Sequence, residues 1–331
     1  MPAKSYRDAI REALREEMKR DERVFIMGEE VGVWGGTYAV TRGLYDEFGD
    51  KRVKDTPISE AAIVGTAVGA AMGGLRPVAE LMTINFSLIA IDQIVNNAAK
   101  VHYMFGGQIT APVVVRTAAG WGQLAATHSQ SFEAWFASLP GLIVVMPATP
   151  YDAKGLLKTA IRSDNPVMFI EHSRLYGVTG EVPDGDYTIP FGRSDVKRTG
   201  KDLTIITYSR MLYPSLSAAD KLAGDGIQAE VIDLRSLRPL DMEPVYASVQ
   251  KTHRALIVEE DWVSGGMGAE IAARIGKESF DFLDAPVERI GIADAPLPYA
   301  KNLEALAIPN EQQVIDQARQ MVDGRVQGRR E

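Results

Sequence analysis

Cysteine is absent from the 331-residue sequence, and histidine occurs only four times. Without a thiol the chain cannot form disulfides, thiolate nucleophiles, zinc–cysteine sites or iron–sulfur clusters. The scarcity of histidine favours oxygen ligands for any metal site. Catalytic chemistry must therefore come from carboxylates, from the few histidines or from a bound cofactor.

Basic residues are also in deficit. Lysine and arginine number 36 against 44 acidic residues, which leaves a formal net charge of −8. A protein that binds nucleic acid usually presents a basic face or stripe, and an anionic membrane surface attracts the same charge. We expect neither nucleic acid nor a membrane among the partners of this chain.

Long apolar runs are missing as well. The least polar stretch, residues 61–75, is fifteen residues long, whereas a membrane-spanning helix needs roughly 20. The N-terminal residues are charged throughout and lack the apolar core of a signal peptide. These observations predict a cytoplasmic protein.

The remaining composition is that of an ordinary globular protein, and 331 residues predict two domains. Unbroken apolar runs such as VVV and LIVV are typical of parallel strands that are covered on both faces. An α/β domain with alternating strands and helices is therefore predicted. Its expected strands are 24–28, 77–82, 112–116, 142–146 and 167–171, and its expected helices start after Ser5 and cover 61–73, 87–103, 130–137 and 150–163.

Residues 177–200 are rich in glycine, proline and charge and lack a sustained period, which predicts a linker. The sequence thus divides into a first domain at 1–176, this linker, and a smaller α/β domain at 201–331. Alternation resumes in that second domain. Its expected strands are 203–209, 229–234, 255–260 and 287–292, and its expected helices are 214–223, 244–251, 268–279 and 311–323.

Three glycines, Gly65, Gly69 and Gly73, recur every four residues in the helix predicted at 61–73. Each costs about 1 kcal/mol relative to alanine inside a helix, so the repeat needs a packing reason. Tight packing within the chain and a helix contact between subunits both explain it.

Several polar residues lie where chemistry is expected. Glu60 begins the glycine-rich helix, where a carboxylate also complements the helix dipole. Glu29 follows the strand at 24–28, at the edge where open α/β sheets bind ligands. His128 lies on a polar loop after the segment TAAGWGQL. Each has an ordinary structural explanation when it is considered alone.

Together these segments form a recognisable series. GEEVGVWGGTYAVTRGL, DTPISE, GTAVGAAMGGLRPVAELMTINFS, AIDQIVNNAAK and HSQSFEAWFASLPGLIVVMP occur in order, followed by VIDLRSLRPLD and KTHRALIVEEDWVSGGMGAEI. The series resembles the beta subunits of thiamine-diphosphate-dependent 2-oxoacid dehydrogenases over nearly the whole chain. The resemblance implies a pyrimidine-binding domain with a parallel sheet flanked by helices, followed by a transketolase C-terminal α/β domain.

The resemblance also implies a divided active site. In the family an alpha subunit holds the cofactor diphosphate through Mg²⁺, with a Gly-Asp-Gly motif followed by paired asparagines. This chain has no such motif, because its Gly185-Asp186 precedes a tyrosine and its Asn96-Asn97 comes earlier. It is therefore expected to supply the pyrimidine side of the site within an α₂β₂ heterotetramer, and to be inactive alone. The lipoyl acyltransferase core is the other expected partner.

Individual roles follow from the matching positions. Glu60 is implied to bond the cofactor pyrimidine and to help activate the cofactor by proton transfer, and Glu29 to order the site. Phe86 is implied to stack on the aminopyrimidine ring, and His128 to face the substrate or the lipoyl group. A structural K⁺ ion is implied at the backbone carbonyls of Val113, Ala160, Ile161, Ser163 and Asn165.

The implied reaction is oxidative decarboxylation of a 2-oxoacid, with the acyl group passing to a lipoyl group. Pyruvate is the favoured substrate, and acetoin and branched-chain oxoacids remain alternatives because an absent alpha subunit shares the substrate pocket. A non-catalytic scaffold subunit is a further alternative, although the presence of Glu60, Phe86 and His128 together favours catalysis.

Overall fold

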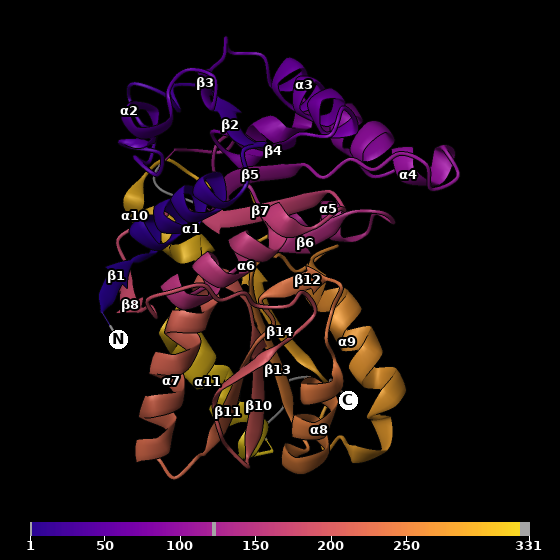
Figure 1. Ribbon diagram of the computed structural model, residues 1–331. Coiled ribbons are helices and arrows are strands. Elements are labelled where there is room, and N and C mark those ends of the chain that lie inside the picture. The colour runs from indigo at the N-terminus through magenta and orange to yellow at the C-terminus, as the bar shows by residue number, and fades with distance from the viewer. Residues whose placement is uncertain (1, 121–123, 325–331) are drawn as a thin grey trace. The chain divides into compact units, whose positions relative to one another are not determined.

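The computed structural model describes residues 2–120 and 124–324, which form two compact units. The first unit contains residues 2–120, 127–191 and 237–239, and the second contains 124–126, 192–236 and 240–324. Each unit has its own sheet with helices against it (Figure 1). Part of the segment before His128, residues 121–123, and residues 325–331 of the predicted second domain lie outside the described residues.

A seven-stranded sheet with the order β12-β6-β7-β5-β4-β2-β3 forms the centre of the first unit. Every neighbouring pair from β6 to β3 is parallel, and the central strands are buried along their whole length. The parallel sheet predicted from the apolar runs is thereby confirmed. The strands are β2 (Val24–Gly28), β3 (Val53–Asp55), β4 (Arg76–Leu81), β5 (Val114–Ala119), β6 (Ile143–Val145), β7 (Val167–His172) and β12 (Ser236–Arg238).

Two helices of the first unit, α1 and α6, begin at a side-chain cap. The Ser5 hydroxyl accepts a hydrogen bond from the Asp8 N–H at the start of α1, and Thr149 caps α6 in the same way. α1 and α6 lie side by side (Figure 1). The helices are α1 (Tyr6–Arg20), α2 (Leu44–Phe48), α3 (Glu60–Met72), α4 (Val101–Met104), α5 (Glu133–Ala137) and α6 (Pro150–Arg162).

The single helix predicted at 87–103 is wrong. The segment instead forms a 3₁₀ turn, η1 (Ile84–Leu88), a π-helical turn, η2 (Gln93–Ala98), and the short α4. The polar side chains interleaved there bond locally: Asp92 accepts from the Asn96 and Gln93 amides, at 2.7 and 3.2 Å. Side-chain hydrogen bonds of this kind compete with regular helix geometry.

Two short strands lie in the region predicted as a linker without regular structure. β8 (Thr179–Glu181) pairs antiparallel with β1 (Ala3–Ser5) near the N-terminus. β9 (Asp195–Arg198) pairs antiparallel with β11 of the second unit. Strands of three or four residues are too short for a period of two to be recognised in sequence.

The second unit is built on a five-stranded sheet with the order β14-β13-β10-β11-β9. α7 and α11 lie on one side of it, and α8 and α9 on the other (Figure 1). The predicted alternation is confirmed here. Its other elements are β10 (Leu203–Thr207), α7 (Leu212–Gly224), β11 (Ala229–Asp233), α8 (Glu243–Thr252), β13 (Ala255–Trp262), α9 (Met267–Glu278), β14 (Glu288–Ile292), α10 (Lys301–Ala307) and α11 (Glu311–Val322), with 3₁₀ turns η3 (Ser209–Met211) and η4 (Phe280–Phe282).

The apolar run at 61–75 forms α3 and the turn that follows it. Over residues 2–120 and 124–324 no helix is long and apolar enough to cross a membrane. Within the chain, only Gly65 of the glycine repeat meets another element closely: a Cβ there would lie 3.2 Å from Gln93 Oε1. Gly69 has no neighbouring atom within 4 Å of that position. Packing within the chain therefore explains Gly65 but not Gly69.

Candidate active site

Two buried carboxylates, Glu29 and Glu60, define the candidate site. Glu29 follows β2 directly, and Glu60 is the first residue of α3. They are 8% and 4% exposed. Burial raises the pKa of Glu29, and the charge of Glu60 is the next largest cause. The two carboxylates thus lie within each other's electrostatic field.

Neither carboxylate forms a hydrogen bond or an ion pair with any residue in the described part of the chain. The carboxylate oxygens of both residues reach the surface of the described chain, because none of them is a buried atom without a hydrogen-bond partner. A helix-dipole role accounts for Glu60 at the start of α3, but it does not account for a second carboxylate beside it. The pair is therefore suited to receive a ligand that donates hydrogen bonds.

The Glu29 loop, residues 29–43, follows the carboxyl end of β2 and is held in place by hydrogen bonds between backbone and side-chain groups. The Gly32 N–H donates to Asp55 Oδ1 at 2.6 Å, which anchors the loop to the end of β3. The Thr41 hydroxyl donates to the Val31 carbonyl at 2.7 Å. The loop therefore holds Glu29 at the sheet edge where α/β folds bind ligands.

A second pair of predicted residues is also brought together. The rings of Phe86 and His128 lie 5.4 Å apart, edge to face. Phe86 belongs to η1 and is half-buried, whereas His128 is exposed and its Nδ1 lies 2.9 Å from the Thr127 hydroxyl. Asn85 Oδ1 accepts a hydrogen bond from the Gln130 N–H at 3.1 Å, so the two segments are joined beside the aromatic contact.

The carbonyls implied to bind K⁺ lie near the amino ends of the strands, whereas Glu29 follows the carboxyl end of β2. Val113 and Asn165 precede β5 and β7, and the other three lie at the end of α6. Four of these five carbonyls already accept protein hydrogen bonds. Arg76 donates to those of Ile161 and Ser163, at 3.1 and 2.9 Å, while backbone N–H groups bond those of Val113 and Ala160. Each carbonyl retains a second lone pair, so the oxygen donors still fit a cation that shares them with Arg76.

A buried charge network beneath the candidate site was not predicted from the sequence. Arg116 of β5 forms ion pairs with Glu80 of β4 and Glu171 of β7, and all three are buried. The Tyr176 hydroxyl donates to Glu171 Oε2 at 2.5 Å. The available signal was a charged residue inside each of the apolar runs PVAEL, VVVRT and VMFIEH.

Side-chain clusters of three or more His, Asp or Glu residues that could hold a metal ion are absent from the described residues.

The glycines at 265–268 resemble a nucleotide-binding loop in sequence only. The Gly268 N–H, at the start of α9, donates to Glu259 Oε2 at 2.7 Å. Arg289 Nη2 binds the same carboxylate, at 2.9 Å from Oε1. Because a buried protein carboxylate occupies this helix N-terminus, the glycines serve close packing: a Cβ at Gly268 would lie 2.3 Å from Glu259.

Asp261, two residues further along β13, provides a pH-dependent stability prediction. Burial, reinforced by the charge of Glu259, raises the pKa of Asp261 to about 7. The pKa of an aspartate in an unfolded chain is about 3.9. Between these values the folded chain keeps a proton that the unfolded chain has lost. The free energy of unfolding therefore falls as the pH rises from about 4 to 7.

Asp261→Asn mimics the protonated acid and keeps the acceptor for the Trp262 N–H, 2.7 Å away. We expect it to stabilise the chain at pH 8 by on the order of 2 kcal/mol and to have a smaller effect at pH 5. Urea unfolding at both pH values measures this difference. The exposed Asp281→Asn is the control, and an equal effect of Asp261→Asn at both pH values would refute the prediction.

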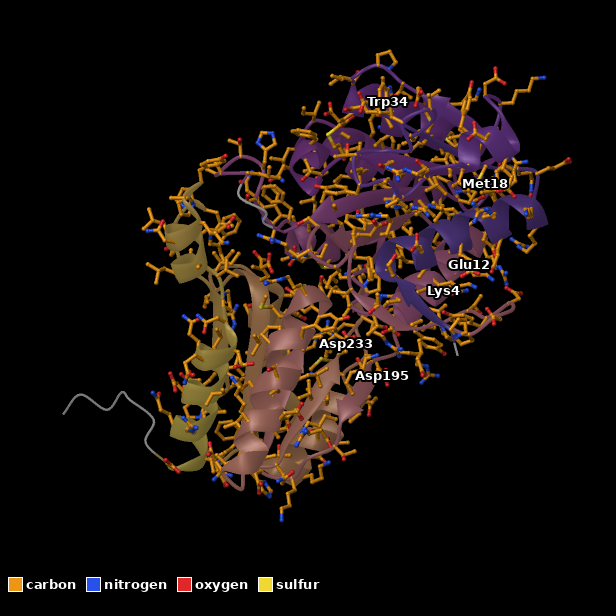
Figure 2. All side chains as sticks on the ribbon, turned by 90° about the vertical axis from the view of Figure 1, so that its left-hand side faces the viewer. Lys4, Glu12, Met18, Trp34, Asp195 and Asp233 are labelled. Carbon is orange, nitrogen blue, oxygen red and sulfur yellow. The ribbon has the colours of Figure 1, made fainter. Side chains whose placement is uncertain are left out.

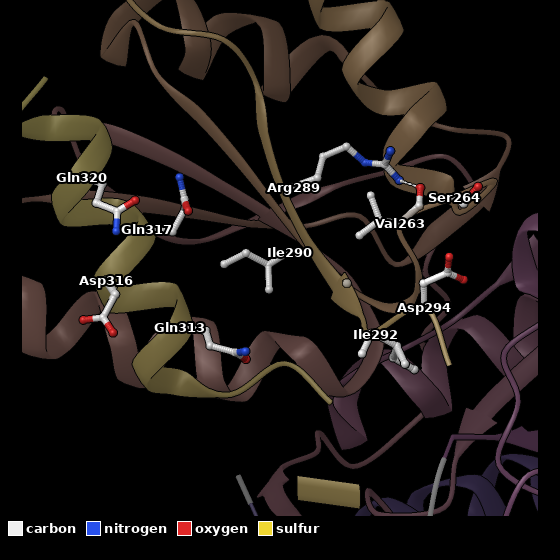
Figure 3. Close-up of a pocket in the computed structure, with 12 residues that line it drawn as sticks. Val263, Ser264, Arg289, Ile290, Ile292, Asp294, Gln313, Asp316, Gln317 and Gln320 are labelled. Atoms are coloured by element: carbon white, nitrogen blue, oxygen red, sulfur yellow. Dashed lines mark hydrogen bonds between the residues drawn. The ribbon is translucent and has the colours of Figure 1, made fainter. Parts of the chain in front are cut away.

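A cavity of about 800 Å³ lies in the second unit, between β14 and α11. Figure 3 shows Ile290 between the glutamine side chains of α11 and Arg289, whose guanidinium also donates to the Val263 carbonyl. None of the predicted site residues lines this cavity.

Comparison with known families covers most of the chain. The family described as "Transketolase, pyrimidine binding domain" matches residues 3–179, and the family described as "Transketolase, C-terminal domain" matches residues 192–314. A solved structure described as a split-gene transketolase, an inactive β4 tetramer, aligns with a TM-score of 0.79 and 25% identity. The alignment covers 96% of this chain and 98% of that one.

Curated relatives share about half of their residues with this chain. A pyruvate dehydrogenase E1 component subunit beta of Rickettsia felis is 51% identical, over 94% of this chain and 95% of the relative. The mitochondrial subunit beta-1 of Arabidopsis thaliana is 51% identical over 93% and 86%, and the mitochondrial subunit beta of Drosophila melanogaster is 50% identical over 97% and 89%. This chain therefore belongs to the family of pyruvate dehydrogenase E1 component beta subunits, built from a transketolase pyrimidine binding domain and a transketolase C-terminal domain.

Proposed function

We propose that this chain is the beta half of a thiamine-diphosphate-dependent pyruvate dehydrogenase and acts with an alpha subunit. The reaction is oxidative decarboxylation of pyruvate, with transfer of the acetyl group to a lipoyl group. The observation that carries the proposal is the buried, unbonded pair of Glu29 and Glu60 at the ligand-binding edge of the sheet. The identity of about half to beta subunits over nearly the whole chain supports it.

Glu60 is the proposed proton-transfer group. The Glu60 carboxyl group is 4% exposed and forms no ion pair within the described chain, so it is available to exchange a proton with a bound donor. When bound, thiamine diphosphate supplies the electron sink for decarboxylation, which no side chain can provide. Glu29 lies beside Glu60, and burial together with the charge of Glu60 raises the pKa of Glu29.

Phe86 and His128 complete the proposed site. A half-buried phenylalanine offers a flat apolar face on which the aminopyrimidine ring of the cofactor can stack. His128 packs against that phenylalanine with the two ring planes at 84° and is itself exposed. From this loop its imidazole can donate a hydrogen bond or a proton to a substrate or to an incoming lipoyl group.

Exposed apolar side chains beside the carboxylates support a site shared with another subunit. Trp34 of the Glu29 loop is 74% exposed (Figure 2), and Ile58, two residues before Glu60, is 82% exposed. Large apolar groups exposed next to a buried polar site mark a surface that a partner covers. We propose that an alpha subunit covers it within an α₂β₂ heterotetramer, brings the Mg²⁺-held diphosphate, and assembles on a lipoyl acyltransferase core. A cytoplasmic location remains part of the proposal.

Pyruvate is the proposed substrate because the relatives are named for pyruvate dehydrogenase. The discriminating experiment is a panel of pyruvate, acetoin and branched-chain oxoacids on the chain reconstituted with its alpha subunit. We expect the highest kcat/KM for pyruvate. A preference for acetoin or for a branched-chain oxoacid would overturn the substrate assignment, and no turnover of any of them would favour a scaffold subunit.

A structural K⁺ ion at the carbonyls of Val113, Ala160, Ile161, Ser163 and Asn165 is also proposed. An ion that binds only the folded state raises the melting temperature as its concentration increases. We therefore expect melting a few degrees higher in KCl than in choline chloride of equal ionic strength. Identical melting in the two salts would contradict a K⁺ ion at these carbonyls.

A further inference from the structure

The buried network beneath the candidate site has a geometry that a purely structural ion pair does not need. Gly28, Glu80 and Arg116 lie in register on the neighbouring strands β2, β4 and β5. Arg116 spans two carboxylates: Nη1 binds Glu80, while Nε and Nη2 bind the two oxygens of Glu171. The fork of a guanidinium fixes such carboxylates in direction as well as in distance.

The network also contacts the Glu29 loop at two points. Gly36 in that loop has φ +78°, and a Cβ there would lie 3.0 Å from Glu80 Oε1. Tyr38 of the same loop stacks on Tyr176 with ring centroids 4.7 Å apart. The loop that begins with Glu29 therefore lies directly against both ends of the network.

Charge connects the network to the candidate site as well. One guanidinium faces two carboxylates, so the array carries a net negative charge when both are ionised. The groups that act on Glu29 are Glu60 from α3, Glu30 from the loop and Glu80 from β4, and after burial they all raise the pKa of Glu29. The pKa of Tyr38 is likewise raised, first by burial and then by Glu171 and Glu80.

We propose that Arg116, Glu171 and Tyr176 clamp the Glu80 carboxylate against the Glu29 loop, which makes Glu80 a positioning residue of the active site. The role of Glu80 has two parts. Its Oε1 atom supports the loop at Gly36. Its negative charge disfavours ionisation of the Glu29 carboxyl group. This inference rests on the proposed function of the Glu29 and Glu60 pair.

The charge part is tested without turnover by infrared difference spectroscopy of carboxyl groups in the reconstituted complex. The Glu29→Gln variant identifies the Glu29 band in this spectrum. In Glu80→Gln, which keeps the shape of the side chain and removes its charge, we expect the titration midpoint of Glu29 to move to lower pH. In Glu80→Asp, which keeps the charge, the midpoint should stay near that of the unmodified chain. An unchanged midpoint in Glu80→Gln would overturn this part.

The positioning part is tested by hydrogen exchange in residues 29–43 of the same complex. Tyr176→Phe removes the hydroxyl that binds Glu171 and keeps the ring that stacks on Tyr38. We expect exchange in the loop to become roughly fivefold faster, the factor that one lost hydrogen bond produces. Tyr187→Phe is the matched control, because its hydroxyl bonds the Tyr151 carbonyl and no network residue. Equal exchange in the two variants would overturn the clamp.

Turnover separates this inference from the proposed function. If Glu80 acts through Glu29, the limb of the kcat/KM profile on which Glu29 loses its proton should move to lower pH in Glu80→Gln and stay in place in Glu80→Asp. If Glu60→Gln is inactive and the pH profile of kcat/KM in Glu80→Gln is unchanged, only the positioning role of Glu80 is contradicted. A fully active Glu60→Gln complex would contradict the proposed function, while the infrared and exchange results would still decide the clamp.

Discussion

Replacing Glu60 by glutamine is expected to lower pyruvate turnover of the reconstituted complex by about 10²–10⁴-fold, the usual contribution of a positioned acid–base group. The amide keeps the size and the hydrogen-bonding capacity of the side chain but cannot exchange a proton with a ligand. Because the carboxylate of Glu60 forms no hydrogen bond or ion pair within the described chain, the substitution removes no side-chain bond that supports the fold. The loss should therefore appear in kcat and leave thermal melting almost unchanged.

Glu22→Gln is the matched control, because Glu22 is exposed and precedes β2, at the end of that strand opposite to Glu29. We expect it to keep nearly the full rate. Initial rates with an artificial electron acceptor, measured beside melting curves, separate chemistry from folding. Wild-type turnover by the Glu60→Gln complex would exclude Glu60 as the proton-transfer group.

Replacing Arg116 by methionine should have the largest effect on stability. The guanidinium is 2% exposed and is the only cation paired with Glu80 and Glu171 among the described residues. Its removal leaves two buried carboxylates uncompensated, and breaking a buried ion pair in this way costs about 3–5 kcal/mol. Urea unfolding followed by tryptophan fluorescence measures the change.

Two further variants test the reason for that loss. Arg274→Met breaks an exposed pair with Glu270 and should change the free energy of unfolding by less than about 0.5 kcal/mol. Adding Glu80→Gln to Arg116→Met removes one uncompensated charge, so the double variant should be more stable than Arg116→Met alone. If the second substitution destabilised the chain further, the loss would come from packing and not from buried charge.

The strands and helices that were predicted correctly are those whose side chains follow a simple pattern. β2, β5 and β7 are continuous apolar runs, and α1 has a stripe of buried residues after a serine cap. Such patterns are local, so sequence alone is sufficient to find them. The segment 84–104 was mispredicted because the hydrogen bonds of Asp92 and Asn85 decide its backbone, and periodicity does not record them.

The candidate site was predictable only in part. Glu29, Glu60, Phe86 and His128 were chosen from their sequence context and from the family resemblance, and the structure places them in two pairs. Arg116 and Glu171 were missed because they are 55 residues apart and meet only through the strand order of the sheet. A charged residue inside an apolar strand is the one local sign of such a pairing.

The divided active site is tested by measuring pyruvate decarboxylation with this chain alone, its alpha subunit alone and the two combined. Each assay contains thiamine diphosphate and Mg²⁺ at equal concentrations. We expect turnover only in the combined sample, because this chain lacks the Gly-Asp-Gly motif and exposes Trp34 and Ile58 beside its carboxylate pair. Sustained turnover by this chain alone would contradict it.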